Sequence, residues 1–306
     1  MVKYYTCQDG YVESDSWSPN GWINVECPGQ DDIRFLLSEV GVPESFLDSV
    51  ADPDERPRFE REGDWLLTII RIPLCTHRSP QVYRTVPLGI MTKDDIIVTL
   101  CHAHSEMIPD FIAHSVKRHI KVDTQPDFVL RLIFSSTYWY QKYLKNMSVT
   151  VNSAEKQLQR SVRNEDLLGL MDMQKALVYF STSLRGNSML TERLNKIFID
   201  DCDPELLEDV DIELTQANNT VEIYIQILGG TMDTFASVIS NNVNEIMKKL
   251  TCISIIIMVP TLIASFYGMN VDNGVSSVRP AFWLIIVVSF SLAALIYLWL
   301  RRAKWL

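Results

Sequence analysis

Residues 244–270 read NEIMKKLTCISIIIMVPTLIASFYGMN. From Leu250 to Tyr267 this stretch contains no charged residue, and a second uncharged run follows from Ala281 to Leu300. Each run is about long enough to cross the hydrocarbon core of a bilayer as a helix. Two buried helices of a soluble core are the alternative, but core helices usually keep a polar face. The sequence therefore predicts a transmembrane hairpin with spans at about 250–267 and 281–300.

Basic residues at the ends of the two runs predict the orientation of the hairpin. The short connecting loop carries one basic residue, Arg279, opposed by Asp272. By the positive-inside rule the loop then lies outside and both termini are cytoplasmic, in a cell membrane crossed twice. The flanking basic residues are Lys248, Lys249, Arg301, Arg302 and Lys304.

Polar and small side chains follow one line along the first span. Steps of three and four residues from Asn244 reach nearly every hydroxyl of this helix, whereas the other positions are mostly Ile, Leu, Val and Phe. Such spacing indicates a seam at which copies of the helix meet around an axis. Simple packing of small residues between membrane helices would give the same spacing. The line comprises Met247, Thr251, Ser254, Met258, Thr261, Ser265 and Gly268.

The same line continues upstream and stays mostly polar, through Ser237, Asp233, Gln226 and Gln216 to Asp209. A dry seam would be apolar there, so the pattern favours a water-filled channel over packing alone. A helix from Asp209 to Gly268 would be roughly 90 Å long. The pair Gly229-Gly230 is the position at which such a helix would most easily break.

The tripeptide Gly268-Met269-Asn270 after the first span, with Lys304-Trp305-Leu306 at the end, resembles the CorA family of magnesium transporters. The resemblance is strong over about the last hundred residues and architectural before them. It implies a homopentamer with an internal α/β domain, a long stalk helix and no ATP hydrolysis. It also implies a selectivity filter at Gly268, Met269 and Asn270. Pore or gate positions carried over from the family are Asn244, Met247, Leu250, Met258 and Thr261.

Mg2+ is the substrate that the resemblance implies, with Asn270 holding the ion through its water shell. Mg2+ is also the implied regulator, because Asp209 matches a family position that binds regulatory Mg2+ between subunits. Asp94 or Asp95 is a possible partner in the N-terminal domain. The external loop VDNGVSSVRP departs from the acidic loop of many relatives and leaves Asp272 as its only carboxylate. Weaker cation capture at the outer surface is the expected consequence.

A second group of metal-binding residue types lies in the N-terminal half, but its spacing matches no known zinc pattern. We interpret it as ordinary residues at strand ends. Its members are Cys75, His77, Cys101, His102 and His104.

The soluble part alternates short Ile-, Val- and Thr-rich runs with helical patterns. Strands are predicted at 64–74 and 83–100, and helices at 31–40 and 105–116. Long helices are predicted from 127 to 198, with a turn at 160–166. The predicted fold is an α+β cytosolic domain (α/β/α) at 1–126, a long helical region at 127–247 and the membrane hairpin at 248–306.

Composition and motifs exclude several functions. The formal charge of −10 argues against nucleic acid as a partner. No Walker loop, GxGxxG or nucleophile elbow is present, so we expect neither an enzyme nor an organic cofactor. The family resemblance then implies a passive Mg2+ channel that admits Co2+ and Ni2+. A zinc-transporting branch of the same family and a membrane-anchored sensor or scaffold remain as alternatives.

Overall fold

The computed structural model describes residues 1–7, 10–17, 21–76, 82–122, 124–158, 164–198, 202–269 and 280–305. Side chains are described at all of these positions except 154–158, 164–166 and 281. Contacts divide the chain into two units, Met1–Met232 and Asp233–Leu306.

A seven-stranded sheet forms the centre of the first unit, in the order β2-β1-β3-β7-β6-β5-β4. Only the β3–β7 pair is parallel among the described strands, and the others are antiparallel. The strands are β1 (Val2–Cys7), β2 (Tyr11–Ser14), β3 (Gly21–Glu26), β4 (Arg58–Glu62), β5 (Trp65–Cys75), β6 (Tyr83–Lys93) and β7 (Ile96–Cys101).

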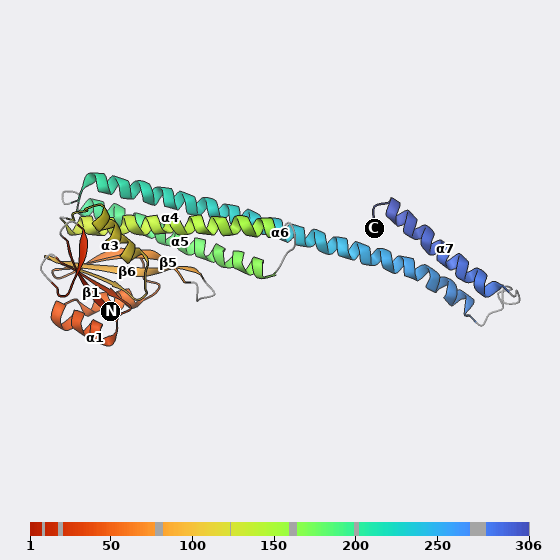
Figure 1. Cartoon of the computed structure of the whole chain (residues 1–306), viewed down its shortest axis with the longest axis horizontal. Helices are drawn as coiled ribbons and strands as arrows, with labels where there is room; N and C mark the ends of the chain where they lie inside the picture. The colour runs from red at the N-terminus through yellow and green to blue at the C-terminus, as the bar shows by residue number, and fades with distance from the viewer. Residues whose placement is uncertain are drawn as a thin grey trace. The chain divides into compact units, whose positions relative to one another are not determined.

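Helices cover both faces of this sheet, as Figure 1 shows. On one face lie α1 (Gln30–Phe35), the π-helical η1 (Leu36–Val40) and α2 (Glu44–Ala51). Their side chains Leu36, Phe46 and Val50 share one apolar core with Ile23 and Leu67 of the strands. The other face is covered by α3 (Met107–Lys117), α4 (Gln125–Leu158) and α5 (Asn164–Ile197).

Aromatic rings fill the core between the sheet and α3–α4. The ring of Trp22 in β3 lies 5.2 Å from that of Phe128 and 6.0 Å from that of Phe111, measured between centroids. The Trp22 indole donates to Thr99 Oγ1 at 2.8 Å. With helices on both faces of a mixed sheet, the predicted α/β/α architecture is confirmed.

The elements predicted in the soluble part are present, with small shifts in their bounds. Strand 64–74 is β5, and 83–100 divides into β6 and β7 at a turn where Asp94 has a positive φ of 46°. The helix at 31–40 is α1 with η1, and 105–116 is α3. Of the predicted turn at 160–166, residues 160–163 lie outside the described part, and 164–166 belong to α5.

Helix α6 (Pro204–Tyr267) is 64 residues long and runs without a break through Gly229-Gly230 and Pro260. It begins after Asp203, whose Oδ1 accepts from the Glu205 N–H at 3.0 Å, with Pro204 at the first helical position. The predicted continuous stalk helix is therefore confirmed.

In the first unit, α6 packs beside α4 and α5 (Figure 1). Gln141 Nε2 of α4 donates to Glu213 at 2.8 Å, and Asn218 Nδ2 donates to Ser188 Oγ of α5 at 3.0 Å. The apolar residues that α6 buries recur every three, four or seven positions, as expected for one helix face. They are Val210, Leu214, Ala217, Val221 and Leu228.

The second unit contains the rest of α6 and α7 (Ala281–Arg302). Cys252 of α6 and Ala293 and Leu300 of α7 are buried within it. The C-terminal turn folds back on α6, where Cys252 Sγ lies 3.7 Å from the Trp305 carbonyl and Lys248 Nζ lies 5.2 Å from the Trp305 ring centroid. The sequence pattern does not predict this contact, because it depends on how the hairpin closes.

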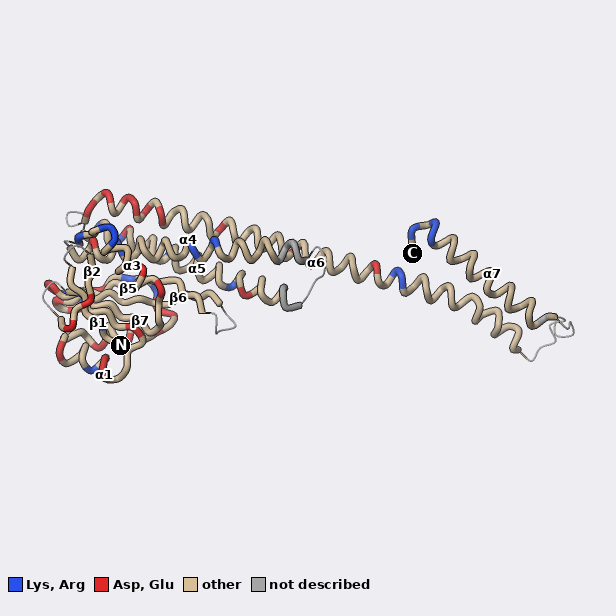
Figure 2. The backbone as a smooth tube through the Cα atoms, viewed as in Figure 1, with Lys and Arg blue, Asp and Glu red and all other residues tan. Residues whose placement is uncertain are grey.

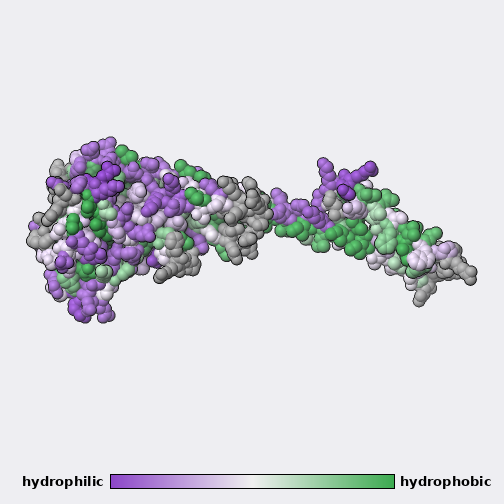
Figure 3. Space-filling model, viewed as in Figure 1, coloured by the Kyte–Doolittle hydropathy of each residue, from purple (hydrophilic) through white to green (hydrophobic). Residues whose placement is uncertain are grey.

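Both predicted spans are helices with little buried surface. Their most apolar windows have mean hydropathies of 2.1 and 2.4, and only 6% and 11% of each window is buried. Figure 3 shows the apolar surface that they expose, and Figure 2 places charges only at their ends. Helices of a soluble core would bury such surface, so the exposure favours contact with lipid.

Candidate functional site

The predicted polar line of α6 is exposed along its whole length in the single chain. Within the membrane span, Thr251, Ser254, Thr261 and Ser265 are all exposed. The apolar residues of the predicted gate are exposed too: Met247 at 55%, Leu250 at 56% and Met258 at 64%. Asn244, Asp233 and Asp209, farther toward the helix start, are likewise exposed. One chain therefore leaves the entire predicted pore face uncovered.

Hydroxyl groups on this face donate into their own helix. Thr251 Oγ1 donates to the Met247 carbonyl at 2.8 Å, Ser254 Oγ to that of Leu250 at 2.9 Å, and Thr261 Oγ1 to that of Ile257 at 2.9 Å. Because each proton is directed into the helix, the oxygen lone pairs remain available on the outside. A surface of exposed acceptors suits a hydrated cation, whose water shell donates hydrogen bonds.

The opposite face of the α6 span is less exposed, and Cys252 on it lies 3.7 Å, Sγ to O, from the Trp305 carbonyl in the turn after α7. The residues of the span that are buried or half-buried are Cys252, Ile256, Val259, Pro260, Ile263 and Tyr267. At 3.6 residues per turn, this set lies roughly across the helix from Thr251, Ser254 and Thr261. Exposed Ile255, Leu262 and Phe266 form a further apolar surface that lipid can cover. The hydroxyl face is the most polar part of the span.

Gly268 and Met269, the described part of the predicted filter, follow directly after α6 and are exposed. The Gly268 N–H donates to the Ala264 carbonyl at 2.9 Å, which closes the last helical turn. A Cβ at position 268 would lie only 3.3 Å from that carbonyl oxygen, so the backbone is tight here. Asn270 and the loop residue Asp272 lie outside the described residues.

Carboxylates gather at the start of α6, as Figure 2 shows. Some have structural contacts: Asp203 caps the helix and Glu213 accepts from Gln141. Asp209 is exposed, as are Asp94 and Asp95 in the β6–β7 turn. Within the described residues of one chain, no three His, Cys, Asp or Glu side chains come close enough to hold a metal ion. A regulatory site at Asp209 would therefore need ligands from another chain or from water.

The described members of the cysteine and histidine group form no metal site. Cys101 is buried, and burial raises the pKa of its thiol to about 12. His104 Nδ1 is instead 2.7 Å from Glu26 Oε2. Burial lowers the pKa of His102, and His77 lies outside the described residues. A thiol that stays protonated at neutral pH is a poor zinc ligand.

Comparison with known families decides the identity of the chain. A family model described as CorA-like Mg2+ transporter protein matches residues 19–302. The chain belongs to this family. With two helices long and apolar enough to cross a bilayer, it is a membrane transport protein and not an enzyme.

Relatives extend the similarity over nearly the full length. The cobalt/magnesium transport protein CorA of Methanocaldococcus jannaschii is 26% identical over 295 residues, which cover 93% of this chain and 91% of the relative. The complete structure of the CorA magnesium transporter from that organism has a TM-score of 0.82 at 23% identity, covering 100% and 99% of the two chains.

A solved ZntB cytoplasmic domain from Vibrio parahaemolyticus is also similar, with a TM-score of 0.59 at 18% identity. It covers 79% of this chain and 98% of that domain. At 23% and 18% identity, these two structural matches show only that the fold is shared.

Proposed function

We propose that this CorA-family chain is one subunit of a homopentameric divalent-cation channel that passes chiefly Mg2+ and admits Co2+ and Ni2+. The observation that carries the proposal is the exposed face of α6, on which Thr251, Ser254 and Thr261 direct their protons into the helix. Copies of that face arranged around an axis would form a wet lining of oxygen acceptors. The number five is carried over from the family resemblance.

Neutral oxygens suit Mg2+ because this ion loses water reluctantly. In the proposal, Asn270 amides and Gly268 carbonyls form a collar that holds the ion through its hydration shell. Gly268 allows close approach because it lacks a Cβ. Uncharged ligands also release the ion, as conduction requires. Mg2+ is thus the substrate, and no organic cofactor takes part.

Voltage supplies the driving force in this scheme. Both termini lie in the cytoplasm, and a divalent ion gains about 4.6 kcal/mol per 100 mV on entering a negative interior. Such a potential would raise the Mg2+ concentration in the cell far above what the cell needs. A gate must therefore close the pore. Rings of Met247, Leu250 and Met258 would close it by excluding water.

Internal Mg2+ is the proposed signal for closing. Asp209 of one subunit would hold the ion against a neighbouring subunit, with Asp94 or Asp95 as possible partners. All three carboxylates are exposed in the single chain. Asp209→Ala channels should then stay open at internal Mg2+ concentrations that shut the wild type. Closure of both at the same concentration would refute this role.

Uptake by proteoliposomes tests the proposal. The purified wild type should admit Mg2+ under an inside-negative potential, and Asn270→Ala should abolish or strongly reduce uptake. Asn273→Ala, the same change three positions along the loop, is the matched control and should transport normally. A wild type that admits no divalent ion would support the sensor or scaffold alternative instead.

The zinc branch is tested in the same vesicles. The similarity to the ZntB domain concerns the cytoplasmic fold and not the ion path. We expect faster uptake of Mg2+ than of Zn2+ at equal concentration. Preference for Zn2+ would place the chain with the zinc transporters.

A further inference from the structure

A cavity of about 920 Å³ opens in the first unit between the β5–β6 edge and α5. Its volume is in the range of pockets that hold small organic ligands. In a chain with a formal charge of −10, its lining is unusually basic. Asp54 is its only acidic residue among those described, against six arginines: Arg56, Arg58, Arg71, Arg84, Arg185 and Arg193.

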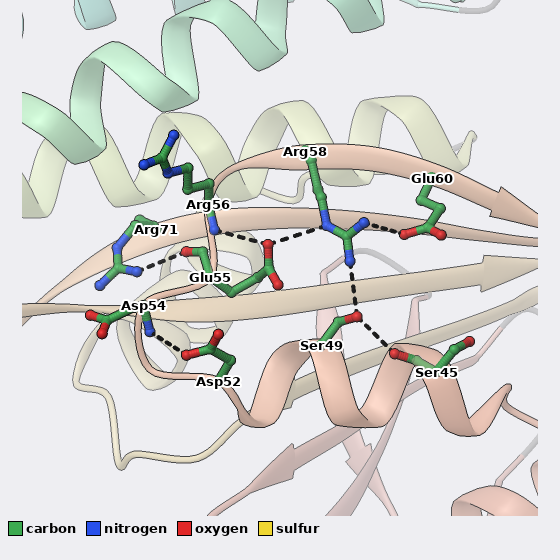
Figure 4. Close-up of polar contacts among 9 residues, drawn as sticks. All are labelled: Ser45, Ser49, Asp52, Asp54, Glu55, Arg56, Arg58, Glu60 and Arg71. Carbon is green, nitrogen blue, oxygen red and sulfur yellow. Dashed lines mark hydrogen bonds and ion pairs between the residues drawn. The ribbon is translucent and has the colours of Figure 1, made fainter.

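Two of these arginines, Arg71 and Arg58, make hydrogen bonds or ion pairs within the protein. Arg71 donates to the carbonyls of Pro53, Glu55 and Thr85 at 2.8–2.9 Å, and thereby fixes the segment before β4 against β6. Arg58 is paired with Glu55 and Glu60 and donates to Ser49 Oγ at 2.9 Å, as Figure 4 shows. Both guanidinium groups are therefore already engaged within the protein.

Three other arginines are exposed, whereas the sixth, Arg185, pairs with Glu222 at 3.3 Å. Among the residues that the structure describes, the guanidinium groups of Arg56, Arg84 and Arg193 have no hydrogen-bond or ion-pair partner. Figure 4 shows the Arg56 guanidinium turned away from the Arg58 network. They come from three separate places in the sequence: the segment before β4, strand β6 and helix α5. Like charges brought together repel, so a cluster of this kind favours an anionic ligand.

Part of the lining is apolar. Val178, Tyr179 and Met189 of α5 border the cavity and are 51%, 49% and 56% exposed. Exposed aromatic and thioether side chains offer a surface for a flat organic group. The cavity therefore combines a strongly cationic part with an apolar part.

We propose that this cavity binds a nucleoside polyphosphate. Three guanidinium groups without a described protein partner line this cavity from different elements. They match the spread negative charge of linked phosphates, which arginine binds through paired N–H donors. The apolar surface of α5 would hold the nucleoside. The site is separate from the α6 face and is independent of the proposed transport function.

Binding to the purified full-length protein tests the proposal, with calorimetric titration of ATP, tripolyphosphate and adenosine in Mg2+-free buffer. ATP should bind, tripolyphosphate more weakly, and adenosine not measurably. Arg84→Gln and Arg193→Gln should each weaken ATP binding by about tenfold or more, because a charge-assisted contact is lost. Tripolyphosphate binding as tight as that of ATP would overturn the proposal, because the nucleoside would then contribute nothing to affinity.

Arg34→Gln is the matched control, since Arg34 is exposed on α1, outside the cavity, and pairs with Asp31 at 3.1 Å. It should bind ATP like the wild type. The proposal is overturned if neither phosphate compound binds, or if the cavity variants bind ATP unchanged. It is also overturned if those variants alter the assembly in size-exclusion chromatography without phosphate binding, because the arginines would then join copies of the chain.

Discussion

Asn187 of α5 completes the hydrogen bonding of strand β5 where its neighbour β4 has ended. The last β4–β5 pair is Arg58 with Ile69, and Arg71 lies two residues beyond it. The Arg71 N–H and carbonyl both point to this side of β5, away from its β6 partner Pro87. The fully buried Asn187 therefore accepts from the Arg71 N–H at 3.0 Å and donates to the Arg71 carbonyl at 2.9 Å.

Asn187→Leu removes both bonds and replaces the amide with an apolar side chain that branches at the same atom but is larger. The Arg71 N–H loses its only acceptor among the described residues, which costs about 1–3 kcal/mol for a buried group. The carbonyl still accepts from the Tyr140 hydroxyl at 3.1 Å, so its loss is smaller, about 1 kcal/mol. Together the free energy of opening around β5 should fall by about 2–4 kcal/mol.

Hydrogen exchange of the full-length protein measures this change directly. Peptides covering β5 should exchange about thirtyfold faster or more in Asn187→Leu. Asn218→Leu is the control, because Asn218 is only half-buried and bonds Ser188 Oγ and the Leu214 carbonyl of its own helix. Equal protection of β5 in wild type and Asn187→Leu would refute the reasoning.

Three further predictions concern packing, thiol chemistry and the pore face. Gly89→Ala would place a Cβ 2.3 Å from Val50 Cγ2, so it should lower the unfolding midpoint, and adding Val50→Ala should restore most of the loss. Mass spectrometry after mild alkylation at neutral pH should find exposed Cys27 modified and buried Cys101 unmodified. The reason is that burial raises the pKa of the Cys101 thiol to about 12. Labelling of Cys101 in the native protein would contradict its burial. Thr261→Val should slow Mg2+ uptake several-fold without changing assembly. Thr231→Val is the control and should not slow uptake, because it removes a similar bond to the Ile227 carbonyl at 2.9 Å but lies off the polar line. Equal effects of the two changes would argue against a special role of that line.

The membrane part was predictable because its signals are local. Uncharged runs and the step of three and four residues are both read within a few turns of helix. Packing that joins distant segments carries no such signal. Strand β3, which includes Asn24, was not predicted, because a buried Asn interrupts the apolar pattern. Its side chain accepts from Thr99 Oγ1 at 2.8 Å, across 75 positions of sequence.

The arginine cavity was missed for the same reason. Arg56, Arg84 and Arg193 look like ordinary solvated charges in the sequence, and only the fold brings them to one place. Strand β4 and helix α2 also escaped prediction, since each is short and adjoins a charged segment. In contrast, the polar line of α6 was recognised because every member lies on one helix.

Thiol accessibility in the membrane tests the central claim most directly. In a Cys252→Ser background, cysteines would replace Ser254 and Thr261 on the polar line, and Ile255 and Leu262 on the apolar surface. A charged, membrane-impermeant thiol reagent should modify Ser254→Cys and Thr261→Cys and block Mg2+ uptake, while leaving the other two unmodified. Equal modification at all four positions, or modification only at Ile255→Cys and Leu262→Cys, would contradict a water-filled axis lined by this face of α6.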